Sequence, residues 1–281
     1  MKKILKIIDI LLETIGININ LRKPNSRRLE KVLNLKPKPF KKTKFVYNNR
    51  KSIYQLSPMP SEKDLFNFYR NKYWVDFRKK RNLINTRDLF HFNLLNFYLK
   101  KYPPKSDLKK ASFLNFGSGH GGISHIVYTH GMRVINIEPD PMTVKYSKFY
   151  EQFLSLEEYL KNSGDKIDIF YSSHVLEHLR DIEEFLKQLR LISHDNTLFF
   201  IEVPDALSPG NGVQNNSLDI PHTLYFTKKF FESEFNEILH ISHQLFNNKM
   251  NIDINSYHDL NKPYEPKQRG VIRCISRKLK K

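Results

Sequence analysis

The stretch "SFLNFGSGHGGISHIVYTHGMRVINIEPD", residues 112–140, decides the fold class of this chain. An apolar run is followed by a glycine-rich turn, then by an amphipathic helical pattern, and then by a second apolar run. Four of the ten glycines in the chain lie in the turn, at positions 117, 119, 121 and 122. Glycine permits a tight strand-to-helix turn and lets a ligand approach the bare backbone. The stretch therefore predicts the first strand–helix–strand unit of a doubly wound sheet.

The alternation of strand and helix patterns continues beyond this unit. We expect strands over 166–173, 196–205 and 270–278, and helices over 141–152, 156–164, 181–193 and 227–235. Such alternation requires crossover connections and a mostly parallel sheet covered on both faces. The sequence therefore predicts an α/β fold.

The part of the chain before residue 105 has a different organisation. Residues 1–21 have helical amphipathic spacing, and residues 22–57 are basic, contain several prolines and suggest an arm or linker. Residues 58–104 contain two aromatic, helical segments, which we interpret as a helical cap. The core domain is expected to cover residues 105–281.

The charge of the chain is concentrated at its beginning. The formal net charge is +18, and residues 1–51 contain 15 Lys/Arg but only 3 Asp/Glu. This basic segment could bind nucleic acid, an anionic membrane surface or a phosphorylated substrate, or it could reflect an AT-rich genome. The amphipathic helix could pack on its own domain, on a partner chain or on the inner membrane surface. The single cysteine, Cys274, excludes an internal disulfide and suits the cytoplasm.

The glycine turn matches a dinucleotide-binding pattern. Gly117, Gly119 and Gly122 have the G-x-G-x-x-G spacing, and Glu138 follows at the end of the next strand. A carboxylate at that position can accept hydrogen bonds from both hydroxyls of a ribose. The pattern fits NAD and S-adenosylmethionine equally, so it does not identify the cofactor.

Two later motifs carry a resemblance to a known family. The segment "IDIFYSSHVLEHLRDIEEFLKQL", residues 167–189, followed by "TLFFIEVPD", residues 197–205, resembles the class I S-adenosylmethionine-dependent methyltransferases. The resemblance covers about residues 105–281 and implies a Rossmann-like, seven-stranded sheet and S-adenosylmethionine as cofactor. The aromatic stretch over 54–74 is similar to the cap of bacterial methyltransferases associated with sugars and surface glycans.

The resemblance also implies a cofactor site. The glycine turn would contact the methionine portion of the cofactor, Glu138 would bind the ribose, and the adenine would lie near residues 155–157. The implied cofactor residues are Asn115, Gly117, Ser118, Gly119, His120, Gly121, Glu138, Leu156 and Ser173. Asn115 departs from the family, which has an acidic residue there that helps to hold the cofactor's amino group. The sequence therefore leaves open where that group is bound.

A group of histidines follows the fourth strand of the core. His174, Glu177 and His178 are expected at the carboxyl edge of the sheet, where open α/β sheets bind substrates, and His222 follows later. One histidine could act as a general base, the four residues could bind a metal, or the turn could be purely structural. The Glu-x-x-Glu-His run of two methyltransferase groups, with a later histidine in one of them, is similar. Histidine in the first position would favour zinc, manganese or iron over magnesium.

Other residues are weaker candidates for the same site. Tyr69 and Tyr73 could bind a substrate, although their helical spacing is also typical of core residues, and Asp205 leaves the fifth strand beside the expected cleft. We expect the remaining histidines, such as His91, His240 and His243, to be surface or packing residues.

The leading hypothesis is an S-adenosylmethionine-dependent O-methyltransferase that acts on a sugar or sugar derivative in bacterial surface-polysaccharide biosynthesis. The alternatives are an RNA 2′-O-methyltransferase, a nicotinamide-dependent oxidoreductase and a non-catalytic scaffold with the same fold. No RNA-binding module is recognisable, so a nucleic-acid partner is not expected. A cytoplasmic location, with peripheral membrane contact through residues 1–51 as an alternative, completes the hypothesis. The sequence leaves the oligomeric state open.

Overall fold

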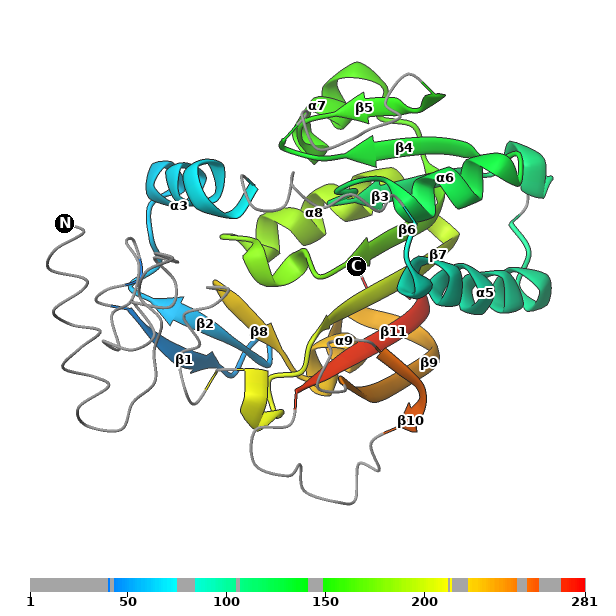
Figure 1. Cartoon of the computed structure of the whole chain (residues 1–281). Helices are drawn as coiled ribbons and strands as arrows, with labels where there is room; N and C mark the ends of the chain where they lie inside the picture. Colours follow the sequence, from blue (N-terminus) through cyan, green and yellow to red (C-terminus); the bar gives the residue numbers. More distant parts are fainter. Residues whose placement is uncertain are drawn as a thin grey trace, which may run out of the picture.

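The computed structural model of the chain (Figure 1) describes residues 40, 43–74, 84–104, 107–140, 149–211, 213, 222–246, 252–257 and 269–280. The predicted amphipathic helix over 1–21 and residues 22–39 of the basic arm lie outside the described residues. Among the described helices, none combines the length and the hydropathy that crossing a bilayer requires.

The centre of the molecule is an eight-stranded sheet with the order β10-β9-β11-β7-β6-β3-β4-β5. Its strands are β3 (Ser112–Phe116), β4 (Arg133–Ile137), β5 (Glu151–Phe153), β6 (Ile167–Ser173), β7 (Ser193–Pro204), β9 (Phe235–Phe246), β10 (Ile252–Tyr257) and β11 (Gly270–Leu279). Strands β5, β4, β3, β6 and β7 pair in parallel, and β11 is antiparallel to both β7 and β9. The predicted seven-stranded, mostly parallel sheet is confirmed, and β10 adds an eighth strand at its edge.

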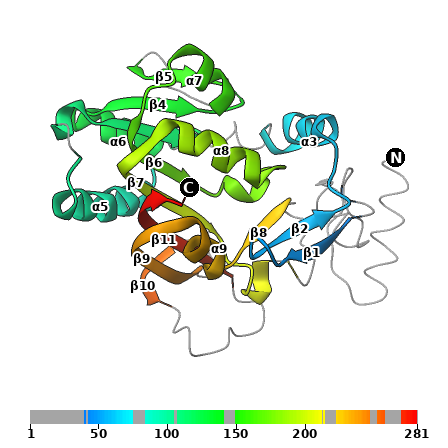
Figure 2. The same cartoon turned by 180° about the vertical axis from the view of Figure 1, so that it is seen from behind.

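Helices cover both faces of this sheet (Figures 1 and 2). Helices α5 (Thr86–Lys101) and α6 (Gly122–Thr129) pack on one face, and α7 (Leu156–Asn162), α8 (Ile182–Ile192) and α9 (Lys228–Glu234) pack on the other. In α8 the apolar residues 182, 185, 186 and 189 recur at helical spacing and are buried, and Asp181 caps the first turn as predicted. Each face therefore has its own apolar core.

A second, three-stranded antiparallel sheet lies beside the first one. It has the order β1-β2-β8, with β1 (Lys44–Asn48), β2 (Ile53–Ser57) and β8 (Leu224–Phe226). Just before β8, Thr223 donates its backbone N–H to the carbonyl of Glu177, at 2.8 Å. Its hydroxyl donates to the carbonyls of Glu177 and Leu179. These bonds hold the segment that contains His222 against the turn after β6.

The structure corrects three expectations from the sequence. Residues 44–57 are not part of a linker but form β1 and β2, whose pairing with β8, far away in the sequence, has no local signal. Helix α5 does not belong to a separate cap, because Phe92, Leu95 and Leu99 pack in the core of the main sheet. The helix expected over 141–152 is wrong at its end, where β5 begins at Glu151, while residues 141–148 lie outside the described residues.

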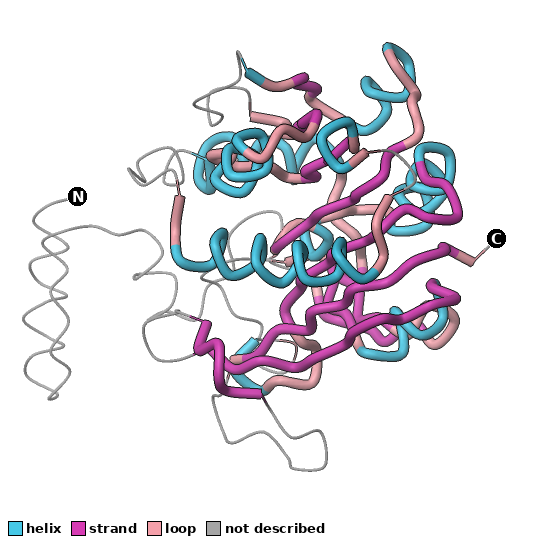
Figure 3. The backbone as a smooth tube through the Cα atoms, turned by 90° about the vertical axis from the view of Figure 1, so that its right-hand side faces the viewer, coloured by secondary structure: helices cyan, strands magenta, loops and turns pink. Residues whose placement is uncertain are grey.

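The site lies where the strand order changes direction. Figure 3 shows the strands of the sheet side by side, with helices around them. In the sheet β3 lies between β4 and β6, and the chain passes through β4 and β5 before it returns to β6 on the other side of β3. Ligands of open α/β sheets bind outside the carboxyl ends of the strands at such a point.

Candidate active site

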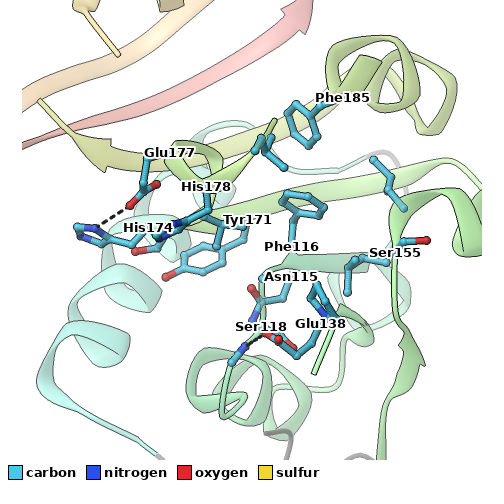
Figure 4. A pocket seen from close by; sticks show the side chains of 18 of the residues that line it. Asn115, Phe116, Ser118, Glu138, Ser155, Tyr171, His174, Glu177, His178 and Phe185 are labelled. Carbon is cyan, nitrogen blue, oxygen red and sulfur yellow. Dashed lines mark hydrogen bonds and ion pairs between the residues drawn. The ribbon is translucent and has the colours of Figure 1, made fainter. Parts of the chain in front are cut away.

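A cavity of about 700 Å³ opens at the carboxyl ends of β3, β4 and β6 (Figure 4). We divide its lining into two sides. The glycine-loop side contains Gly117–Gly119, Glu138 and Ser155–Glu157, and the histidine side contains Tyr69, Trp74, His174, Glu177, His178 and His222. A volume of this size accommodates a cofactor together with a small substrate.

The glycine loop is held against the ends of both neighbouring strands. Gly117 has a φ of +74°, and it donates its N–H to the carbonyl of Ile137, at 2.8 Å. A Cβ at this position would lie 2.1 Å from a methyl carbon of Val175, in the turn after β6. Only glycine therefore fits here. Ser118, Gly119 and His120 line the cavity, whereas Gly121, with a φ of +76°, caps α6 and is not part of the lining.

Glu138 is fixed at the end of β4, as the sequence predicts. Its carboxylate accepts hydrogen bonds from the backbone N–H of Gly119, at 2.9 Å, and from that of Asp140, at 3.1 Å. Burial raises the pKa of Glu138 to about 7, although both hydrogen bonds act in the opposite direction. Each oxygen accepts one bond in this structure and keeps a lone pair for a ligand hydroxyl.

Asn115 forms part of a buried polar chain. Its Nδ2 donates to the hydroxyl of Ser124, at 2.8 Å, and that hydroxyl donates to Oδ1 of Asn136, at 2.7 Å. The chain needs a donor at position 115, which a carboxylate does not provide. This requirement explains locally why an amide, and not an acid, is accommodated there.

The histidine side brings together three of the predicted residues. One ligand atom each from Glu177, His178 and His222 lies within 4.8 Å of the other two. Glu177 is 1% exposed, and its oxygens have no well-aligned hydrogen bond within the described part of the chain. Burial opposes ionisation of this carboxyl group, but the interaction with His174 outweighs it and lowers its pKa. Burial lowers the pKa of His178, and it lowers that of His222 to about 3, so both rings are neutral near pH 7.

His174 lies beside this group and not within it. Its φ is +57°, and its ring faces the carboxylate of Glu177 (Figure 4). Nδ1 is 3.3 Å from Oε1 of Glu177, and Nε2 is 3.6 Å from Oε1 of Glu202. Of the four predicted metal ligands, His174 is thus the one that the geometry separates from the other three.

Behind His174 lies a buried polar network that the sequence analysis did not identify. Arg273 donates to Oε2 of Glu202 through both Nε and Nη2, and Nε2 of His91 lies 3.0 Å from the same oxygen. Nδ1 of His91 contacts the hydroxyl of Tyr171, at 2.7 Å, and the hydroxyl of Ser173 donates to Oε1 of Glu202, at 3.0 Å. Of the two expectations for His91, a surface position is wrong, because the residue is fully buried, where it packs against Phe200 and forms hydrogen bonds. Its role depends on β7 and β11, which no local pattern connects to α5.

The remaining candidates are distributed unevenly. Tyr69 lines the cavity and contacts Nδ1 of His178 through its hydroxyl, at 2.9 Å. The side chain of Tyr73 lies outside the described part of the structure. Asp205 is not a lining residue, because it is buried against Nδ1 of His243 at 2.5 Å. Asp205 and His243 are thus brought together away from the cavity.

Arg87 is a lining residue that the sequence analysis missed. It is the only lysine or arginine in the lining, as far as the chain is described, and it lies in the first turn of α5. Within the same described residues its guanidinium has no hydrogen bond or ion pair. An unpaired guanidinium at a cavity wall suits an anionic group on a ligand.

Comparisons with known proteins concern the family and the fold of the chain. The model of the methyltransferase domain family matches residues 80–241. A search among curated proteins found no match. Among solved structures, 1,6-didemethyltoxoflavin-N1-methyltransferase from Burkholderia thailandensis, with bound 1,6-didemethyltoxoflavin and S-adenosylhomocysteine, is 13% identical. That alignment covers 84% of this chain and 100% of that chain, with a TM-score of 0.52.

Two further structures have the same kind of similarity. Coclaurine N-methyltransferase bound to N-methylheliamine and S-adenosylhomocysteine is 12% identical, over 75% of this chain and 82% of that chain, with a TM-score of 0.51. A SAM-dependent methyltransferase from Archaeoglobus fulgidus is 20% identical, over 73% of this chain and 100% of that chain, with a TM-score of 0.46. At these identities the similarity concerns the fold.

Proposed function

Because the chain belongs to the methyltransferase domain family and is an S-adenosylmethionine-dependent methyltransferase, we propose that it methylates a hydroxyl group of a sugar or sugar derivative. One observation carries this proposal. A single cavity joins the glycine loop and Glu138 to the group formed by Glu177, His178 and His222. A methyl transferase needs both parts, since one must hold the donor and the other must prepare the acceptor.

The glycine-loop side fits S-adenosylmethionine. Glu138 retains lone pairs for both ribose hydroxyls, and Oγ of Ser118 is buried without a hydrogen-bond partner among the described residues. Arg87 supplies a cation for the carboxylate of the donor. Ser155, Leu156 and Glu157 line the part of the cavity where the resemblance places the adenine.

When bound, S-adenosylmethionine supplies a methyl group on a positively charged sulfur, which leaves as a neutral thioether. The chain's own residues have two tasks in such a displacement. They align the acceptor hydroxyl with the methyl group, and they accept its proton. Tyr69 and Trp74 line the histidine side and offer apolar surface for the carbon face of a sugar ring.

We assign the proton to Nε2 of His178. Nδ1 of this ring contacts the Tyr69 hydroxyl at 2.9 Å, so a tautomer with Nδ1–H donating to Tyr69 places the lone pair of the ring on Nε2. Glu177 lies next to the ring and stabilises the imidazolium that forms. Both nitrogens of His174 face carboxylates, so they are directed at these groups and not at an acceptor.

A second candidate is a metal-assisted transfer at the same place. The buried carboxylate of Glu177, without aligned hydrogen bonds, and the two imidazoles within 4.8 Å form a ligand set that suits zinc, manganese or iron. A divalent ion there would acidify the acceptor hydroxyl directly. Metal analysis of the purified protein, followed by activity measurements after chelation and metal return, separates this candidate from the general base.

The experiment that tests the proposal has two stages. Calorimetry with S-adenosylhomocysteine and with NAD should show binding of the former alone, and the reverse result would contradict the cofactor. Labelled S-adenosylmethionine is then offered with a panel of nucleotide sugars, sugar phosphates and lipid-linked glycans. Methyl transfer to RNA and not to this panel would favour the RNA alternative. The His178→Ala variant should lose turnover while keeping its affinity for S-adenosylhomocysteine.

The basic amino-terminal segment remains a separate part of the proposal. A sugar acceptor in surface-polysaccharide synthesis is often carried at a membrane, and a basic segment is attracted to anionic lipid. Deletion of residues 1–39 should abolish sedimentation with phosphatidylglycerol vesicles and leave turnover of a soluble acceptor unchanged. Salt-sensitive binding to RNA that disappears in the same deletion would instead support a nucleic-acid partner.

A further inference from the structure

The buried network behind the cavity fixes the direction of each of its hydrogen bonds. Glu202 is fully buried, and His91 and Arg273 hold its pKa well below the usual range against the effect of burial, so it is a carboxylate and can only accept. Burial lowers the pKa of His91 to about 4, so its ring is neutral near pH 7 and donates to Glu202 from Nε2. Its Nδ1 then carries a lone pair, and the Tyr171 hydroxyl must donate to it, at 2.7 Å.

The same reasoning applies to Ser173. Its hydroxyl donates to Oε1 of Glu202, at 3.0 Å, so its proton also points away from the cavity. Tyr171 and Ser173 lie two residues apart on β6, hence on one face, and both line the cavity. Because both protons are engaged behind the wall, the two oxygens can present only lone pairs to a ligand.

The position of this wall relates it to Asn115. In the parallel pairing of β3 with β6, Asn115 lies directly beside Tyr171. Neighbouring strands are about 4.8 Å apart, so Asn115 and Tyr171 border the same part of the cavity, which both residues line. Asn115 itself is engaged with Ser124, and it lacks the charge of the family's acid.

We propose that the oxygens of Tyr171 and Ser173, held as acceptors by His91 and Glu202, bind the ammonium group of S-adenosylmethionine. The ammonium is the one group of the donor with several N–H bonds and no lone pair, which is what two fixed acceptors select. Arg87 lies nearby on α5 and takes the adjoining carboxylate. Glu202 and His91 are then positioning residues, because they act on the ligand through the two hydroxyls.

This inference rests on the proposed function, since it presupposes that S-adenosylmethionine occupies the cavity. The test compares two ligands by calorimetry on the purified full-length chain. One is S-adenosylhomocysteine, and the other is the analogue in which hydrogen replaces the α-amino group. We expect the wild-type chain to bind S-adenosylhomocysteine at least tenfold more tightly than the analogue, because hydrogen bonds to a charged group are strong.

Tyr171→Phe removes one acceptor, and Ser173→Ala removes the other. Each should lower the affinity for S-adenosylhomocysteine about tenfold and leave that for the analogue nearly unchanged. Ser172→Ala is the matched control, because Ser172 lies between them on β6, is fully buried and does not line the cavity. It should leave the ratio of the two affinities at the wild-type value.

The ratio separates a specific contact from a general loss of structure, which would weaken both ligands alike. An unchanged ratio in both Tyr171→Phe and Ser173→Ala, or a wild-type chain that does not distinguish the ligands, would overturn the inference alone. Failure of the wild-type chain to bind S-adenosylhomocysteine would overturn the proposed function as well.

Discussion

Two buried glutamates flank His174, and they differ in how their charge is compensated. Glu202 accepts hydrogen bonds from Arg273, His91 and Ser173, whereas Glu177 has no aligned hydrogen bond in the described part of the chain. Burying a charge is costly unless it is paired and hydrogen-bonded. Glu202, whose hydrogen-bonding capacity is used within the protein, therefore supports the structure. Glu177 keeps its capacity to bind a ligand, a proton or a metal.

The largest expected effect concerns Glu202, the fully hydrogen-bonded glutamate. Arg273→Met leaves Glu202 as an uncompensated buried charge and should lower the free energy of unfolding by about 3–5 kcal/mol. Arg277→Met, on the same strand but in partly exposed contacts, should change it by less than about 1 kcal/mol. Urea unfolding followed by circular dichroism measures both. Equal midpoints for Arg273→Met and the wild type would contradict the contrast between the two glutamates.

The second prediction concerns Glu177, the glutamate without aligned hydrogen bonds. Glu177→Gln should lower turnover about a hundredfold or more, because it removes the charge that stabilises a proton on His178. The free energy of unfolding should change by less than about 1 kcal/mol, since the interactions that lower the pKa of Glu177 offset the cost of burying its charge. Glu183→Gln, exposed on α8, should alter neither quantity. Loss of stability together with loss of turnover would show that Glu177 is a structural residue.

Glu138 lies between these extremes, with two backbone hydrogen bonds and a pKa of about 7. The ionised form accepts more hydrogen bonds from ribose hydroxyls, so affinity for S-adenosylhomocysteine should rise about tenfold from pH 6 to pH 8. The stability of the empty protein should change in the opposite direction, because the folded-state pKa is raised above the ordinary value. Stability is lost as the pH rises from about 4.5 to 7.

Glu138→Gln provides the control for this pH dependence. The variant should bind S-adenosylhomocysteine more weakly, with an affinity that no longer changes between pH 6 and pH 8. Calorimetry at three pH values measures both properties. A pH dependence that persists in the variant would assign the titration to another group.

The smallest effect on cofactor affinity is expected when Asn115, which lines the same cavity, is replaced by an acid. Asn115→Asp restores the family's residue but removes the donor to Ser124, which should cost about 1 kcal/mol of stability. Affinity for S-adenosylhomocysteine should remain within about twofold of the wild type, because the ammonium is bound beside Tyr171. Markedly tighter binding would place the ammonium at position 115 instead.

The sequence predicts the glycine-loop side of the cavity better than the histidine side. Gly117, Ser118 and Glu138 come from one strand–turn–helix–strand unit, so their spacing along the chain almost determines their geometry. His222 could be assigned only through the family resemblance, since it reaches Glu177 through the hydrogen bonds of Thr223 to the turn after β6.

The buried network had no local signal at all. Glu202 and Arg273 are neighbours only through the register of β7 and β11, and His91 joins them from α5. In the sequence each is a single polar residue within an apolar pattern. Asp205 shows the opposite error, because its position at a strand end suggested the cavity, while its partner His243 draws it elsewhere.

The close contact of Gly117 with Val175 couples the position of the glycine loop to that of the turn that carries His174. The methyl groups of Val175 fill the space where any other side chain at position 117 would begin, and Val175 is adjacent to His174. A larger residue at position 117 would displace the turn that contains Val175 and His174. A bulkier residue at position 175 would likewise displace the glycine loop. Redesign of acceptor specificity should therefore begin at Trp74, which lines the cavity from another segment, whereas the hydroxyl of Tyr69 contacts His178 in the turn itself.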